Sequence, residues 1–323
     1  MEPAHKLSVR EKICFGLADS SANIFLGMKM MFLPYFYTDV LGISAAAMGL
    51  LFVIARLVDA FYDPFIGNVA DRLQPRHGHY RPWLLWLAVP YGLSCLLVFL
   101  APDFSPTGKL VYAYATYLFL ILMYASTVVP YVALLSALTS DPQERLAANA
   151  WRFTLAKMSF LICSVTVPMF VAWYGKDNEA QAYMVAMSMI AVLATAMMLS
   201  CFFGTKERVK PASLASNVSF KQQLRISLSA RPVVIFYIFK ITSSIAFVIK
   251  GSATIYFVKY FLGRSDGFVS GLLSATAIAG IIAPMIALQL IKRQKVSALG
   301  TLKLAQAGGC IAALALFFVS PDN

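Results

Sequence analysis

The sequence predicts an all-α polytopic membrane protein, and three observations support this fold class. The 323 residues are 59% hydrophobic and 13% charged, whereas a soluble domain carries about 25% charged residues. Uncharged runs at residues 83–101, 110–138, 180–205 and 267–291 approach or exceed the roughly 20 residues that cross a bilayer. The basic residues gather in alternate connections between the apolar segments. These features argue against a soluble globular domain.

We expect nine membrane spans, placed by apolar length and by flanking proline, glycine and charged residues. They lie at about 13–38, 44–70, 83–101, 110–138, 147–174, 180–203, 233–258, 268–291 and 298–319. The first span follows a basic tail and is much longer than a signal-peptide core of about 7 to 15 residues, so we expect it to be retained. The second ends before Arg72, the third and fourth are separated by Lys109, and the fifth and sixth by Lys176. Arg264 separates the seventh and eighth, and the ninth begins after Lys295.

The basic residues also predict the orientation of the chain. Most lysines and arginines lie in the N-terminal tail and in the connections that follow the even-numbered spans, whereas the opposite connections hold Lys109, Lys176 and Arg264. The positive-inside rule therefore predicts a cytoplasmic N-terminus. The net charge of +12 follows from this topology, and we expect no nucleic-acid partner.

The spans form two groups on either side of a polar, basic segment. We expect an N-terminal six-helix bundle at 1–203, a cytoplasmic linker at 204–231 and a partial C-terminal bundle of about three helices at 232–323. Six spans, a linker and a second bundle are the plan of a transporter built from two six-helix halves. The second half is incomplete on this plan. We therefore expect either a C-terminally truncated chain or an error in one predicted span.

The second span carries charges that a membrane helix must compensate. Asp59 and Asp63 are four residues apart and share one helix face with Arg56. Two carboxylates one turn apart supply hard oxygen ligands that suit Na⁺ or a shared proton. The alternative is a structural ion pair with Arg56, although one arginine cannot neutralise both acids. We expect a cation site.

The first span adds Asp19 and Asn23, also four residues apart. This polar face is expected to complete the coordination of the cation or to bind sugar hydroxyls; the alternative is a role in helix packing. Lys29 lies in the same span and either reaches towards the interface or meets a substrate.

Other spans supply further candidates for substrate binding. Tyr124 lies near Pro130 in the fourth span, where a proline bends the helix. Trp151 and Arg152 lie near the start of the fifth span, where they form either an interfacial anchor or a platform for a sugar. Lys240 in the seventh span is expected to pair with the acids of the second span or to meet an anionic sugar such as a glucuronide.

The five cysteines are scattered singly through apolar segments, which predicts neither a disulfide nor a structural metal site. The chain also lacks a phosphate-binding loop and a nucleophile motif, so we expect no enzyme and no cofactor.

Several segments together resemble the glycoside-pentoside-hexuronide:cation symporters, the melibiose-carrier branch of the major facilitator superfamily. They are "YFYTDVLG" (35–42), "ARLVDAFYDPFIGNVADR" (55–72), "GHYRPWLL" (78–85), "VVPYVAL" (128–134) and "DPQERLAANAWRF" (141–153). Bacterial xyloside and glucuronide carriers look nearest. The resemblance implies a major facilitator-type fold, with a complete first bundle and an incomplete second one. It also implies a multi-pass protein of the bacterial inner membrane that acts as a monomer.

The resemblance also implies roles for individual residues. Asp59 and Asp63 match the paired acids of the Na⁺ or H⁺ site, and Arg56 matches the charge that accompanies them. The cytoplasmic loop residues Asp71, Arg72 and Arg81 would stabilise the outward-facing state. Arg152 matches an arginine near the sugar pocket. Asn23 and Val128 replace acids of the melibiose carrier, which argues against melibiose as the substrate.

The function expected from the resemblance is symport of a glycoside, pentoside or hexuronide, driven by Na⁺ or H⁺. Two alternatives remain open at this point. In the first, the chain is a truncated remnant that does not transport. In the second, it is a carrier of lipids or lysolipids from the same superfamily.

Overall fold

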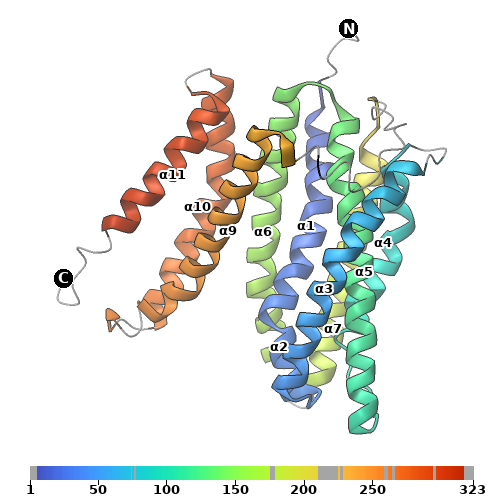
Figure 1. Cartoon of the computed structure of the whole chain (residues 1–323). Coiled ribbons are helices and arrows are strands. Elements are labelled where there is room, and N and C mark those ends of the chain that lie inside the picture. Colours follow the sequence, from blue (N-terminus) through green and yellow to red (C-terminus); the bar gives the residue numbers. More distant parts are fainter. Residues whose placement is uncertain are drawn as a thin grey trace. The chain divides into compact units, whose positions relative to one another are not determined.

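The structure, a computed structural model, describes residues 6–73, 75, 78–174, 179–209, 225, 228–257, 261–263, 266–293 and 296–315. Its helices are α1 (Val9–Met31), α2 (Leu33–Tyr35), the π-helical turn η1 (Phe36–Val40), α3 (Ala45–Arg72), α4 (Arg81–Leu97), α5 (Pro106–Leu138), α6 (Pro142–Tyr174), α7 (Glu179–Gly204), α9 (Arg231–Tyr256), α10 (Asp266–Lys292) and α11 (Ala298–Ala315). Within these ranges there is no β-strand, which confirms the all-α prediction (Figure 1).

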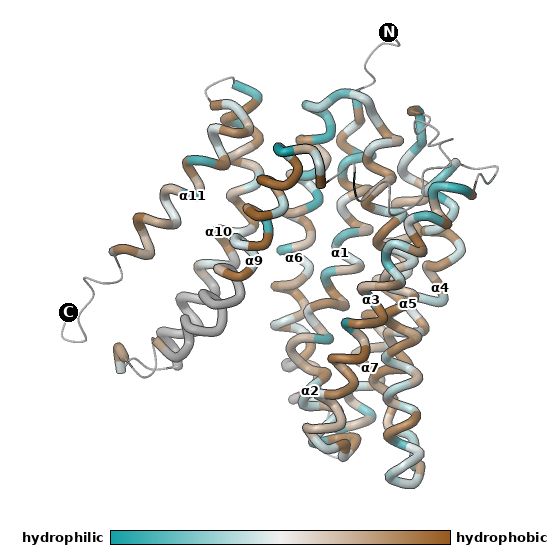
Figure 2. The backbone as a smooth tube through the Cα atoms, in the orientation of Figure 1, coloured by the Kyte–Doolittle hydropathy of each residue, from teal (hydrophilic) through white to brown (hydrophobic). Residues whose placement is uncertain are grey.

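Four of the described helices are long and apolar enough to cross a membrane. They are α3, α5, α7 and the part of α6 from Pro142 to Val171. Hydrophobic residues run along much of α3, α5 and α7 (Figure 2). Charged residues lie near one end of each helix: Asp71 and Arg72 end α3, Lys109 lies near the start of α5, and Glu179 begins α7. This distribution is the one expected for helices whose middles lie in lipid and whose ends meet water.

The first predicted span differs from the structure in where it begins and how it ends. Helix α1 begins at Val9 because Ser8 and Glu11 form a capping box, in which each side chain accepts a hydrogen bond from the other residue's backbone N–H. The helix stops at Met31, and α2 begins with a proline in its first turn. Proline lacks a backbone N–H and cannot continue the α-helical hydrogen-bond pattern.

The described chain forms two units. The first contains α1 to α7 and residues 280–292 of α10; the second contains α9, the first part of α10 and α11. In the first unit α1 packs against α6 and α7, α4 against α5 and α7, and α3 against α5. Its core is rich in fully buried aromatic side chains: Phe15, Phe36, Tyr37, Tyr91, Phe99, Tyr117 and Tyr131.

The predicted division at 1–203, 204–231 and 232–323 stays a prediction. Most of the expected linker lies outside the described residues, although its first part, 204–209, is described and packs within the first unit. Three of the lysines and arginines that marked predicted connections, Lys176, Arg264 and Lys295, also lie outside the described residues, as do the last residues of the seventh and ninth predicted spans.

Candidate functional site

The acidic pair of the second predicted span lies in the middle of α3. The Ser44 side chain accepts a hydrogen bond from the backbone N–H of Ala47 and so starts this helix. Asp59 and Asp63 follow one turn apart, as the spacing predicted. Asp59 is partly buried and Asp63 is exposed.

Arg56 contacts one of these acids loosely. Its Nη1 lies 3.6 Å from Oδ2 of Asp59, and its side chain is 74% exposed, against 22% for Asp59. An exposed ion pair of this kind contributes little to stability. Among the described residues, Asp63 has no ion pair. In the described structure the Arg56–Asp59 contact is therefore not a buried ion pair, and the choice between a cation site and a structural pair stays a prediction.

Helices α1 and α5 bring further polar groups towards the acids. The Nζ atom of Lys29 lies 5.0 Å from the centroid of the Tyr117 ring, and its charge interacts electrostatically with those of Asp59 and Arg56. Tyr62, which precedes Asp63 on α3, shares a hydrogen bond of 2.8 Å between its hydroxyl and that of Ser126 on α5. Groups of α1 and α5 therefore lie near this part of α3.

A second charged cluster joins α1 to α6. The Nε atom of Arg152 lies 3.4 Å from Oδ2 of Asp19, and the two side chains are 17% and 11% exposed. The guanidinium lies over the rings of Phe153 and Tyr131, at 4.8 Å and 5.9 Å from their centroids. Tyr131 is fixed in turn, because its hydroxyl donates to the backbone carbonyl of Phe15. The pair is thus desolvated and held between aromatic rings.

Tyr124 on α5 is within electrostatic range of both charged clusters. Its hydroxyl interacts electrostatically with Asp19 and also with Asp59 and Asp63. The groups predicted from two different spans therefore share a neighbour on α5. Any ligand charge placed beside Tyr124 acts on both clusters.

The remaining predicted substrate residues have less distinctive surroundings. The Asn23 side chain donates to the backbone carbonyl of Asp19, which fixes its amide on α1. Trp151 is partly buried next to Arg152. Lys240 is exposed on α9, in the second unit, so it is not placed relative to the two clusters.

The residues predicted for the loop between α3 and α4 have specific partners. The Tyr80 hydroxyl donates to Oδ1 of Asp71, and burial together with this bond raises the pKa of Tyr80. The Nη2 atom of Arg81 donates to the backbone carbonyl of Phe202, and its guanidinium lies 4.9 Å from the centroid of that ring. Arg72 is exposed at the end of α3.

Glu207 is a member of this loop cluster that the sequence did not indicate. Its carboxylate accepts hydrogen bonds from the backbone N–H groups of His79, Tyr80 and Arg81, at 2.7, 2.8 and 2.8 Å. Helix α4 has no capping bond from the side chain of Tyr80, its N-cap residue, so Glu207 supplies the acceptor. The only signal in the sequence is an acidic residue within a basic stretch.

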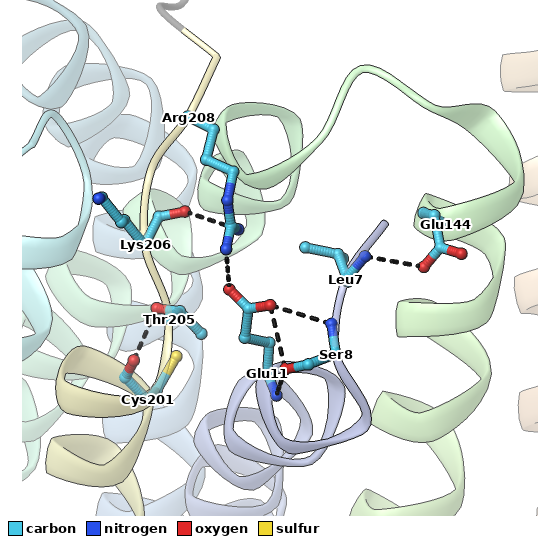
Figure 3. Close-up of polar contacts among 8 residues, drawn as sticks. All are labelled: Leu7, Ser8, Glu11, Glu144, Cys201, Thr205, Lys206 and Arg208. Carbon is cyan, nitrogen blue, oxygen red and sulfur yellow. Dashed lines mark hydrogen bonds and ion pairs between the residues drawn. The ribbon is translucent and has the colours of Figure 1, made fainter. Parts of the chain in front are cut away.

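Arg208, which follows Glu207, ties the segment after α7 to α1, and the start of α1 is tied in turn to Glu144 of α6 (Figure 3). The Nη2 atom of Arg208 lies 2.6 Å from Oε1 of Glu11, and its backbone N–H donates to the carbonyl of Ala137 on α5. Lys12 pairs with Glu144 of α6 at 2.6 Å. The sequence could indicate only the contact between Ser8 and Glu11, because their spacing is that of a capping box.

The pKa of Glu11 shows how strongly this cluster holds a carboxylate. Partial burial raises the pKa, but hydrogen bonds from Ser8 and the adjacent Arg208 guanidinium outweigh it, and the net effect is a lowered pKa. Glu11 precedes the first predicted span and is therefore expected to be ionised at neutral pH.

The charged groups of the first unit can bind a cation and hydroxyl groups. Within the described residues there is no group of three or more His, Cys, Asp or Glu side chains that could hold a metal ion. The acidic pair offers oxygen ligands for a monovalent cation. The Asp19–Arg152 pair offers both an acceptor and donors for hydroxyl groups.

Sequence comparisons relate the chain to known proteins. A family described as "MFS/sugar transport protein" matches residues 14–321. The chain is 40% identical to YagG of Escherichia coli K12 over 266 residues, which cover 81% of this chain and 56% of YagG. It is 36% identical over 264 residues to the inner membrane symporter YicJ of the same organism, covering 82% of this chain and 57% of YicJ.

A third relative is named for its substrate. The isoprimeverose transporter of Lactiplantibacillus pentosus is 33% identical over 288 residues, which cover 88% of this chain and 60% of that protein. The chain therefore spans less than two thirds of the length of these three relatives.

Proposed function

The chain belongs to the MFS/sugar transport protein family, and from this membership we propose that it acts in cation-coupled symport of a sugar across the membrane. The observation that carries the proposal is the arrangement of two charged clusters in one unit, with Tyr124 interacting with the acids of both. One cluster suits a cation and the other suits a sugar.

Asp59 and Asp63 form the cation site of this proposal. Charged groups inside a membrane are costly and are kept where they bind ions or line a polar pathway. Na⁺ and H⁺ are both compatible with a pair of carboxylates, and the loose contact with Arg56 leaves oxygen atoms free to bind either ion.

Asp19 and Arg152 form the sugar site. A carboxylate accepts hydrogen bonds from hydroxyls, and a guanidinium donates them in a fixed planar arrangement. Because the two charges lie 3.4 Å apart and balance each other, the site favours a neutral glycoside over a hexuronide. The name of the isoprimeverose transporter supports this choice of substrate class.

Coupling follows from the shared surroundings of the two sites. A cation that neutralises the acids of α3 lowers the negative potential at Tyr124 and beside Asp19, and so changes the free energy of sugar binding. A coupling free energy of about 1–3 kcal/mol is enough for symport. With the N-terminus in the cytoplasm, as the basic connections predict, the cluster around Glu207 lies at the cytoplasmic face.

Uptake into proteoliposomes tests the proposal. Labelled isoprimeverose and a labelled glucuronide are each supplied with an inward Na⁺ gradient, with an inward proton gradient and with neither. We expect one of the two gradients to drive accumulation of the neutral sugar above its external concentration, and the glucuronide to accumulate less. Equal uptake with and without a gradient would contradict symport, and preferential uptake of the glucuronide would contradict the proposed sugar site.

A further inference from the structure

Lys29 on α1 has no part in the mechanism proposed above. Lys29 lies in the last turn of α1, eleven residues before the end of η1 at Val40. Its side chain does not extend freely towards that end.

The ammonium of Lys29 instead lies over an aromatic ring. Its Nζ is 5.0 Å from the centroid of Tyr117 on α5, which is within the range of a cation–π interaction. Tyr117 is fully buried and packs against Phe52 of α3, with their ring centroids 5.3 Å apart. The ring therefore fixes the ammonium beside α5 and one ring away from Phe52, which lies two turns before Asp59 on the same face of α3.

The groups that Lys29 meets there are charged. Its charge interacts electrostatically with that of Asp59 and with that of Arg56. Arg56 is mostly exposed, and its Nη1 atom comes no closer than 3.6 Å to Oδ2 of Asp59. It therefore compensates the charge of Asp59 weakly. Lys29 is therefore a second basic group within electrostatic range of Asp59.

We propose that Lys29 is a tethered cation that competes with the coupling ion for Asp59. This role rests on the proposed function, in which Asp59 and Asp63 bind that ion. While the site is empty, the ammonium balances part of the charge of the two carboxylates. An arriving cation meets a less negative site, so Lys29 lowers the affinity for the ion and disfavours divalent cations.

Because Lys29 is proposed to lower the affinity for the coupling ion, removing its charge should raise that affinity. Two unit charges about 10 Å apart, at an effective dielectric constant of about 20, change a binding constant on the order of tenfold. Replacing Lys29 by methionine removes the charge but keeps an unbranched apolar side chain against the Tyr117 ring. Damage to the fold would weaken binding of the cation, whereas removal of a competitor strengthens it.

The experiment measures the dissociation constant for Na⁺ on the purified full chain. Thermal stabilisation is titrated with NaCl while choline chloride holds the ionic strength constant. The variants are Lys29→Met, Lys29→Arg and Lys157→Met; Lys157 is an exposed lysine on α6, beside Gly280. We expect Lys29→Met to bind Na⁺ about tenfold more tightly than the wild type, and the other two variants to match the wild type.

The remaining outcomes also decide the matter. A Na⁺ response that appears in Lys29→Met but not in the wild type supports the proposal, because removing the competitor has created affinity. Unchanged or weaker binding in Lys29→Met overturns it, as does the absence of a Na⁺ response in both proteins. The variant Asp59→Asn separates this result from the proposed function: if Na⁺ still stabilises Asp59→Asn, the cation site itself is wrong.

Discussion

Arg152 on α6 and Asp19 on α1 form a desolvated ion pair, with Nε of the arginine 3.4 Å from Oδ2 of the aspartate. The Nε atom is also buried without a hydrogen-bond partner in the described part of the chain. A buried charge pair is costly to break because the remaining partner is left uncompensated. In a sugar site, the same groups are free to exchange part of their mutual interaction for hydroxyl groups.

This geometry predicts that Asp19→Asn and Arg152→Gln each weaken sugar binding by about tenfold or more. Their effects are expected to be less than additive in the double variant, because residues in contact act on the same ligand. Isothermal titration with isoprimeverose measures the three constants. Glu179→Gln, which changes an acid bonded to Tyr35 away from both clusters, should bind as the wild type does. Full additivity would show that the two residues act separately.

Glu207 is predicted to hold the start of α4. Glu207→Ala leaves three backbone N–H groups without their acceptor, so we expect a loss of about 2 kcal/mol in the free energy of unfolding. Glu207→Gln should lose less, because its amide oxygen still accepts. Thermal unfolding in detergent measures both, with Asp103→Ala at an exposed position as the control. A melting temperature of Glu207→Ala equal to that of the control would rule out this capping role.

Gly78 is predicted to be intolerant of any side chain for two separable reasons. Its φ is +117°, and a Cβ atom there would lie 2.7 Å from the Glu207 carboxylate. Gly42 also has a positive φ, of +79°, but a Cβ there meets nothing within 4 Å. Gly42→Ala is therefore expected to cost about 1 kcal/mol from backbone strain alone, and Gly78→Ala clearly more. In the Glu207→Ala background, thermal unfolding should show a smaller difference in stability loss between Gly78→Ala and Gly42→Ala. An unchanged difference would contradict the predicted contact between a side chain at position 78 and the Glu207 carboxylate.

Glu11 gives the cytoplasmic cluster a predicted pH dependence. Its pKa is lowered in the folded protein, where hydrogen bonds from Ser8 and the charge of Arg208 outweigh the effect of burial. A group with a lowered folded pKa stabilises the fold above its unfolded pKa, of about 4.5, and loses that contribution as the pH falls through the folded value. Melting temperatures between pH 6 and pH 3.5 should therefore fall more steeply for the wild type than for Glu11→Gln. Parallel curves would count against the role of Glu11.

The sequence predicted those features that depend on neighbours along one helix. The apolar runs that became α5 and α7 are long enough to identify a span without any tertiary information. The four-residue spacing that places Asp59 and Asp63 one turn apart is likewise a property of a single helix.

Contacts between the ends of different helices could not be predicted from the sequence. Glu207 reaches the amides of His79 to Arg81 across more than 120 residues, and helical periodicity does not say which helix ends meet. Lys29 shows the same limit inside the membrane, because its sequence position left a choice between the interface and a substrate. Its contact with the ring of Tyr117, on another helix, is likewise information that the sequence does not hold.

The dependence of sugar binding on the cation tests the role of Asp59 and Asp63 most directly. Isothermal titration with isoprimeverose is carried out in NaCl and in choline chloride, each at two pH values, on the wild type, Asp59→Asn, Asp63→Asn and Asp103→Asn. We expect Na⁺ or protons to tighten sugar binding about 5- to 150-fold in the wild type and in Asp103→Asn. The Asp59 and Asp63 variants should bind the sugar with no effect of either cation. Retention of the full cation effect in both variants would contradict the proposed coupling site.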